Sequence, residues 1–148
     1  MSAPGDPLRD AVVRRAGNRC EYCQLPGQLQ VGGFEIDHVL PRLRGGQTDL
    51  ANTALACPHC NARKWAHIDG EDPESGQRVT LFHPRTQRWE EHFQWSAQHP
   101  FEIVGTSGHG RATISRLQMN HPDLVSMRRL LAALGIQWRV EASRQRLE

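Results

Sequence analysis

Four cysteines occur in two short pairs, and the spacing within each pair suits a metal ion. The pairs are Cys20 with Cys23 and Cys57 with Cys60, and 33 residues separate them. Two such turns from distant segments can supply the four thiolates of a tetrahedral structural Zn²⁺ site. The alternative is four reduced, partly buried thiols without a metal. His59 lies inside the second pair, and we expect it to be exposed because four cysteines already complete the ligand set.

The segment between the cysteine pairs holds residues suited to metal-dependent phosphodiester cleavage. That chemistry needs a base to activate water, a hard divalent cation to neutralise the phosphate, and ligands for the cation. His38 is a candidate base, because the ordinary pKa of histidine lies near working pH. Asp37 offers the hard oxygen that Mg²⁺ or Mn²⁺ prefers, and Asn52 offers an amide oxygen. An Asp–His pair alone is more often the ordinary end of a buried strand.

Residues 34–40 are predicted to form the strand that carries this pair. Successive side chains on a regular strand point to opposite faces, which would separate Asp37 from His38. Both can serve one phosphate only if the strand bends or ends there. Pro41 permits such an end, because proline cannot donate to a sheet ladder.

The order of these residues resembles that of the HNH endonucleases. Residues 20–64 read C-x-x-C, then I-D-H-V-x-P-x-x-x-G-G, then an asparagine, then C-x-x-C-N-x-x-K. The resemblance implies a ββα-metal fold, in which a β-hairpin and a helix hold one catalytic divalent ion. It also implies that His38 is the general base and Asp37 a metal ligand, while Asn52 holds the loop or the metal. Asn61 takes the third motif position, where many members have histidine, as a metal ligand or as support for one.

Four cationic residues flank this segment and are candidates for contacts to phosphates: Arg42, Arg44, Arg63 and Lys64. Such contacts position a nucleic acid without reading its sequence. Solvated surface charge is the equal alternative for each of them. The net charge of the whole chain is only +2, which argues against a broad surface for nonspecific nucleic-acid binding.

The surrounding pattern predicts an α+β chain in two parts. Residues 1–68 are expected to form the ββα-metal nuclease domain stapled by zinc, beginning with a helix over residues 7–16 that Asp6 caps. Residues 69–148 are expected to form a C-terminal α+β extension packed on that domain. Its predicted segments are a connector over 69–76, strands within 78–84 and 101–105, and helices over 111–119 and 122–134.

The C-terminal part carries no recognisable catalytic pattern. Its histidines are scattered along the sequence, and Trp89 and Trp95 are expected in the core rather than stacked on nucleic-acid bases. The helix over 122–134 has an apolar stripe formed by Leu124, Met127, Leu130, Leu131 and Leu134.

Two functional hypotheses follow. The first is an HNH-type endonuclease that hydrolyses phosphodiester bonds in DNA with one catalytic metal ion. The second is a non-catalytic, zinc-stabilised nucleic-acid-binding module. We expect a cytoplasmic protein without membrane partners, because the sequence has neither a secretory signal nor a long apolar run. The sequence does not decide whether the substrate is DNA or RNA, or whether cleavage nicks one strand or cuts both. It also leaves undetermined the oligomeric state (monomer or homodimer), the target and the biological pathway.

Overall fold

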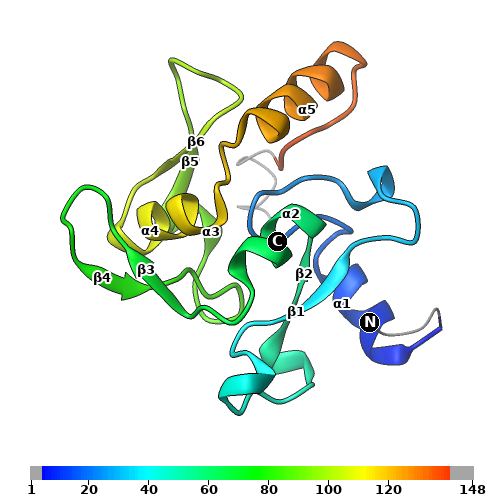
Figure 1. Ribbon diagram of the computed structural model, residues 1–148. Helices are drawn as coiled ribbons and strands as arrows, with labels where there is room; N and C mark the ends of the chain where they lie inside the picture. The colour runs from blue at the N-terminus through cyan, green and yellow to red at the C-terminus, as the bar shows by residue number, and fades with distance from the viewer. Residues whose placement is uncertain (1–4, 141–148) are drawn as a thin grey trace.

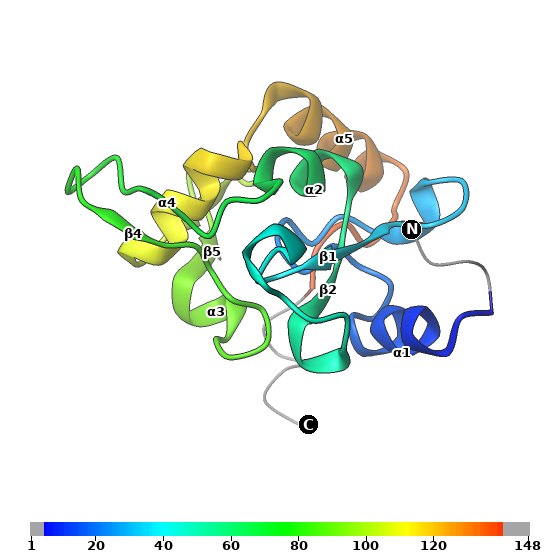
Figure 2. The same ribbon diagram turned by 60° about the horizontal axis from the view of Figure 1, so that its bottom comes forward.

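The computed structural model describes residues 5–140, in which short helices accompany three two-stranded antiparallel sheets (Figures 1 and 2). The helices are α1 (Pro7–Arg15), α2 (Pro58–Lys64), α3 (Trp89–His92), α4 (Gly108–Leu117) and α5 (Pro122–Ala133). The strands are β1 (Glu35–His38), β2 (Thr53–Ala56), β3 (Asp69–Glu71), β4 (Arg78–Thr80), β5 (Phe93–Trp95) and β6 (Ile103–Gly105). Three 3₁₀ turns are η1 (Gly27–Leu29), η2 (Arg42–Arg44) and η3 (Leu50–Asn52).

A ββα unit formed by β1, β2 and α2 lies between α1 on one side and α4 on the other (Figures 1 and 2). The two strands are antiparallel, with Glu35 opposite Ala56 and His38 opposite Thr53. All four residues of β2 are buried, so the hairpin is anchored through its second strand. The α+β class and the ββα arrangement predicted from the sequence are therefore confirmed.

The first helix also follows its sequence signals closely. Asp6 caps α1 by accepting a hydrogen bond from the amide of Leu8 at 2.9 Å, as predicted. Val12 on its inner face is fully buried. Arg15, at the last position, donates to the carbonyl of Thr53 at 2.6 Å and so ties α1 to the start of β2.

The connector predicted over residues 69–76 is wrong, because its first part forms β3 and pairs with β4. Asp72 closes the intervening turn, since its carboxylate accepts from the Glu74 amide and the Ser75 hydroxyl, both at 2.9 Å. The strand predicted within 78–84 is shorter than its apolar run. Beyond β4 the amide of Phe82 donates to the hydroxyl of Thr113 at 2.8 Å instead of to a neighbouring strand.

The C-terminal helices lie close to their predicted positions but differ at their ends. α4 begins three residues early because the Ser107 hydroxyl caps it, accepting from the Gly110 amide at 3.0 Å. It ends at Leu117, because Gln118 adopts a left-handed φ of 48°. β6 occupies only the last part of the strand predicted over 101–105.

The apolar stripe of α5 is only partly covered by the described residues. Leu124 and Leu131 are buried, whereas Met127, Leu130 and Leu134 are exposed.

One continuous apolar core crosses the boundary predicted between residues 68 and 69. Its buried members come from both parts of the chain and include Tyr22, Phe34, Leu55, Phe82, Phe93, Leu117 and Met119. Trp89 and Trp95 pack against this core, as expected, and the indole of Trp89 donates to the carbonyl of Tyr22 at 2.7 Å. The two-domain division itself stays a prediction.

Arg128 of α5 is a buried cation at the junction of the two parts, with 1% of its surface exposed. Its guanidinium donates to the carbonyl of Met119 at 2.6 Å and to that of Phe101 at 2.9 Å. Burial lowers the pKa of Arg128, and electrostatic interaction with Cys23 and Cys60 opposes that shift. Arg128 therefore ties α5 to the segments that contain Phe101 and Met119.

Replacing Arg128 by methionine should therefore destabilise the whole chain. We expect the free energy of unfolding to fall by about 1–3 kcal/mol for each buried carbonyl that loses its donor. Arg129→Met is the matched control, because Arg129 is exposed and contacts only the ring of Phe101 among the described aromatic residues. Urea titration of both variants measures the difference. Equal stability of the two variants would show that Arg128 contributes no more than a surface arginine.

Candidate active site

The four cysteines form a buried cluster with the geometry of a metal site. Their sulfur atoms all lie within 4.8 Å of one another, and the sulfurs of Cys23 and Cys57 are 3.7 Å apart. A disulfide would require about 2.05 Å. A tetrahedral ion with bonds of about 2.3 Å places its sulfur ligands about 3.8 Å apart. The cluster therefore fits a tetrahedral metal such as zinc and not a disulfide.

The thiols of the cluster shift one another's pKa values. Hydrogen bonds from the other three cysteines, Cys20 first, hold the pKa of Cys23 well below its ordinary value. Hydrogen bonds with Cys20 and Cys23 raise the pKa values of Cys57 and Cys60. A cation among the sulfurs would stabilise the thiolate forms that metal ligation needs.

His59 lies outside the cluster but is not exposed, contrary to expectation. Its Nε2 atom is 3.0 Å from the carbonyl oxygen of Leu117 and 2.9 Å from that of Gln118. Because α4 ends against the second cysteine pair, the His59 side chain is half-buried and contacts the C-terminal part of the chain.

Asp37 is buried and accepts two hydrogen bonds through its carboxylate. The Tyr22 hydroxyl donates to Oδ2 at 2.7 Å, and the Lys64 ammonium lies 3.2 Å from Oδ1. Burial raises the pKa of Asp37, while the charge of Lys64 and the hydrogen bond from Tyr22 oppose that rise. Burial and the nearby Asp37 raise the pKa of Tyr22, which therefore stays protonated and donates.

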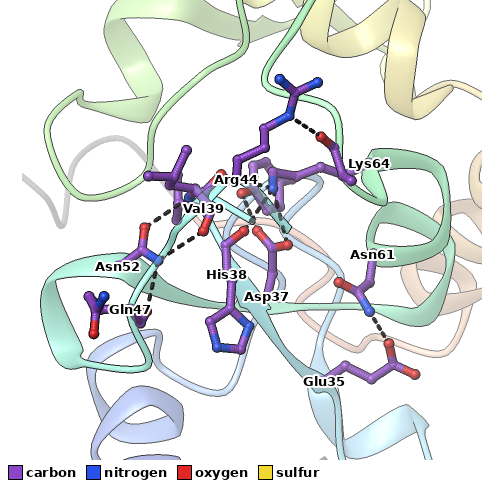
Figure 3. Close-up of polar contacts among 12 residues, drawn as sticks. Glu35, Asp37, His38, Val39, Arg44, Gln47, Asn52, Asn61 and Lys64 are labelled. Atoms are coloured by element: carbon purple, nitrogen blue, oxygen red, sulfur yellow. Dashed lines mark hydrogen bonds and ion pairs between the residues drawn. The ribbon is translucent and has the colours of Figure 1, made fainter. Parts of the chain in front are cut away.

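Lys64 is an interior residue, although both roles considered from the sequence, a phosphate contact and a solvated charge, would place it on the surface. It is 1% exposed, and its ammonium donates to Asp37 and to the carbonyls of His38 at 3.0 Å and Val39 at 3.1 Å. All three ammonium protons therefore have acceptors inside the protein. Figure 3 shows Lys64 reaching from α2 to the end of β1. In this arrangement it has no proton left for a phosphate.

His38 points away from Asp37, as the alternation of a regular strand requires (Figure 3). Its Nε2 atom lies 2.8 Å from the hydroxyl of Thr48. Burial lowers the pKa of His38, and the charge of Asp37 opposes this shift. β1 ends at His38, and both residues line one hollow of about 350 Å³. The strand end thus brings both to one site although their side chains diverge.

Asn52 holds the loop that follows β1. Its Oδ1 accepts from the Leu40 amide at 2.8 Å, and its Nδ2 donates to the carbonyls of Leu40 at 3.0 Å and Gln47 at 2.8 Å (Figure 3). Gly46 is required in this loop, because an added Cβ would lie 1.7 Å from the Leu40 carbonyl oxygen. Of the two roles expected for Asn52, these contacts favour holding the loop over holding a metal.

Asn61 lies on α2 and lines the same hollow as Asp37 and His38. Its Nδ2 donates to the carboxylate of Glu35, which leaves the amide oxygen as a potential metal ligand (Figure 3). Glu35 is a polar partner that the sequence analysis did not select. Its position two residues before Asp37, on the same face of β1, was the available signal.

The three arginines expected near phosphates differ in their surroundings. Arg42 is exposed and lines the hollow. Arg44 donates through Nε to the carbonyl of Ala66 at 2.9 Å, so part of its guanidinium is used within the chain. Arg63, on α2, is half-buried and reaches the carbonyl of His59 at 3.5 Å.

The buried pair of Lys64 and Asp37 makes a stability test possible. Lys64→Met would leave a buried carboxylate without its cation, and removing one partner of such a pair costs about 3–5 kcal/mol of unfolding free energy. Adding Asp37→Asn to that variant should restore part of the loss, because the uncompensated charge is then removed. Urea unfolding of the four forms of this cycle gives the coupling, with exposed Arg42→Met as the control. Additive effects of the two changes would contradict a direct interaction.

Comparison with known proteins agrees with this geometry. Residues 20–66 match the model of the HNH endonuclease family, a segment that contains both cysteine pairs and the ββα unit. No curated protein and no solved structure gave a match. In the described part of the chain, no helix has both the length and the apolar character needed to cross a membrane. Over residues 20–66 the chain is therefore similar to the HNH endonucleases, and this segment contains a four-cysteine cluster that fits a structural metal.

Proposed function

We propose that the protein is a metal-dependent endonuclease that hydrolyses phosphodiester bonds in DNA by the HNH-type one-metal mechanism. The observation that carries the proposal is the meeting of Asp37, His38 and Asn61 at one hollow with exposed Arg42. These residues supply the base, the hard oxygen donors and the positive charge that the reaction requires. We also propose that the protein acts in the cytoplasm, where free cysteines stay reduced and available to a metal.

In this proposal His38 takes the proton of the attacking water. The mechanism uses the tautomer in which Nε2–H donates to the Thr48 hydroxyl 2.8 Å away, because this contact holds the ring and leaves the Nδ1 lone pair as the base. Burial, which lowers the pKa of His38, favours the neutral form that a base needs. Arg42 and Arg63 contact the phosphates that flank the scissile bond.

Asp37 and Asn61 would hold a catalytic Mg²⁺ or Mn²⁺ through oxygen atoms, and Glu35 is a further candidate. Each oxygen of Asp37 accepts one hydrogen bond in the structure, so each retains a lone pair. When bound, the ion stabilises the charge that develops on the phosphate and on the leaving 3′ oxygen. Asn52 shapes the site by holding the loop. The described part of the C-terminal extension supports the domain through the apolar core that the two parts share.

The alternative function is a zinc-stabilised module that binds nucleic acid without cutting it. Plasmid nicking separates the two, with Mg²⁺ or Mn²⁺ present, with no added divalent ion, and with EDTA. Nicks with 5′-phosphate ends that appear only with the divalent ion support the nuclease. Retention of plasmid without any nick, at every concentration of either ion, supports the binding module.

His38→Ala should lower the nicking rate by about 10²–10⁴-fold, the usual contribution of a general base. The melting temperature and the zinc content should stay at the values of the parent chain. His99→Ala is the matched control, because His99 is exposed and lies outside the hollow. A fully active His38→Ala variant would remove this residue from the mechanism.

Substitutions in the second cysteine pair test whether the four cysteines hold a structural metal. We propose zinc, and elemental analysis of the purified protein should find one zinc ion per chain. Cys57→Ser should lose the ion and unfold, because binding of structural zinc supplies folding free energy. In zinc-finger peptides this apparent free energy is about 10–16 kcal/mol. His59→Ala should retain zinc, since the imidazole faces the carbonyls of Leu117 and Gln118 instead of the cluster. Loss of zinc in His59→Ala, or retention in Cys57→Ser, would contradict a four-cysteine site.

A further inference from the structure

Trp65 adopts a backbone conformation that suits glycine far better than tryptophan. It follows the last residue of α2 with a φ of 44° and a ψ of −123°. A positive φ brings the Cβ of a bulky residue close to its own backbone, which glycine avoids. Such strain is retained in proteins where the surroundings enforce it, and it concentrates at functional sites.

Packing within the chain does not explain this tryptophan. Its surface is 66% exposed, and its aromatic contact is an edge-on approach to His67 with ring centres 5.8 Å apart. A buried indole would offset the strain with apolar contacts, but this one faces solvent. A strained, exposed tryptophan is therefore better explained by a ligand than by the fold.

Leu43 borders the same hollow from its other wall. It is the middle residue of η2 and is 80% exposed, between Arg42 and Arg44. Trp65 and Leu43 both line the hollow that also contains Asp37, His38 and Asn61, so two exposed apolar side chains stand beside the candidate catalytic residues.

A hydrogen bond connects the segment that carries Leu43 to the segment that carries Trp65. Arg44, next to Leu43, donates to the carbonyl of Ala66, next to Trp65, at 2.9 Å. Figure 3 shows Arg44 extending from the η2 loop toward the chain beyond α2. The loop is further held by Asn52, whose amide contacts Leu40 and Gln47. The segments that carry the two apolar side chains are thus held by hydrogen bonds between the side chains of Arg44 and Asn52 and the backbone.

We propose that Trp65 and Leu43 form a nucleobase site, which takes one unstacked base next to the scissile phosphate. The inference rests on the proposed nuclease function and narrows its substrate to nucleic acid with an unpaired nucleotide at the cleavage point. The base stacks on the indole, an interaction open to any base because each has a π face. Leu43 occupies the space that the base leaves in the stack, as apolar wedges do in the minor groove.

Charge favours a nucleic acid over an apolar partner at this surface. Arg42 is exposed beside Leu43 and can contact the phosphate of the nucleotide whose base lies on Trp65. An apolar protein segment would leave this guanidinium unpaired. The continuity of the hollow with His38 also places a bound base and a candidate general base in one site.

Binding of short labelled DNAs to the full chain tests the proposal, with His38→Ala present in every form to prevent cleavage. The probes are a single strand, a duplex with a one-base bulge, and the fully paired duplex. Trp65→Gly should weaken binding of the first two by about 5- to 150-fold, the range expected for loss of one base–aromatic stack, and should spare the paired duplex. Trp65→Phe should retain most of the affinity, because phenylalanine also stacks.

The melting temperature of Trp65→Gly separates a ligand role from a structural one. Relief of the positive-φ strain should leave it equal to or above that of the parent. A lower melting temperature together with equal weakening on all three probes would overturn the proposal. Leu43→Ala should weaken binding of the same two probes. Leu130→Ala, the same substitution at an exposed leucine of α5, should leave their binding unchanged.

The remaining outcomes of the binding experiment also decide whether the base site exists. Parent-like binding of Trp65→Gly to all probes overturns the base site, whatever the nicking assay gives. Failure of the chain to bind any probe overturns both the base site and the proposed function. Trp65-dependent preference for the bulged duplex, in a chain that never nicks plasmid, would uphold the base site and reject the nuclease.

Discussion

The buried ion pair between Lys64 and Asp37 is the interaction on which the site depends. It joins the last residue of α2 to β1, and the same ammonium satisfies the carbonyls of His38 and Val39 where the strand leaves its partner. The carbonyl of Val39 would otherwise be buried without a donor among the described residues. The end of β1, and with it the direction of His38, is therefore set by one cation. Tyr22 completes the arrangement from the first cysteine knuckle.

Sequence reasoning succeeded where the determinants are local. The cysteine pairs, the cap of α1 and the ββα order depend on short spacings that are visible in the sequence. It failed where a distant partner decides the outcome. Lysine is almost never fully buried without a partner, and the partner here lies 27 residues away in the chain. β3 was missed for a similar reason, because aspartate, glycine and glutamate have low strand propensity and pair only through the turn at Asp72.

The sequence predicted which residues belong to the site better than it predicted their contacts. Asp37, His38 and Asn61 meet at one hollow, but the sequence did not reveal that the amide of Asn52 is used by the loop or that Asn61 contacts Glu35. The C-terminal part, which had no identifiable chemistry, contributes Arg128 and Trp89 around the cysteine knuckles. Its role is visible only through contacts between segments that are far apart in the sequence.

The burial of Lys64 has a chemical consequence, because it is the only lysine in the sequence. Every cation exposed on the described surface is a guanidinium or an imidazole, and neither forms a stable imine with an aldehyde. Strand scission at a damaged, base-free sugar commonly proceeds through such an imine, which needs an accessible primary amine as nucleophile. With its one lysine amine committed to Asp37, the described part of the chain has no side chain for that route. In the proposed function, scission relies instead on water that His38 activates.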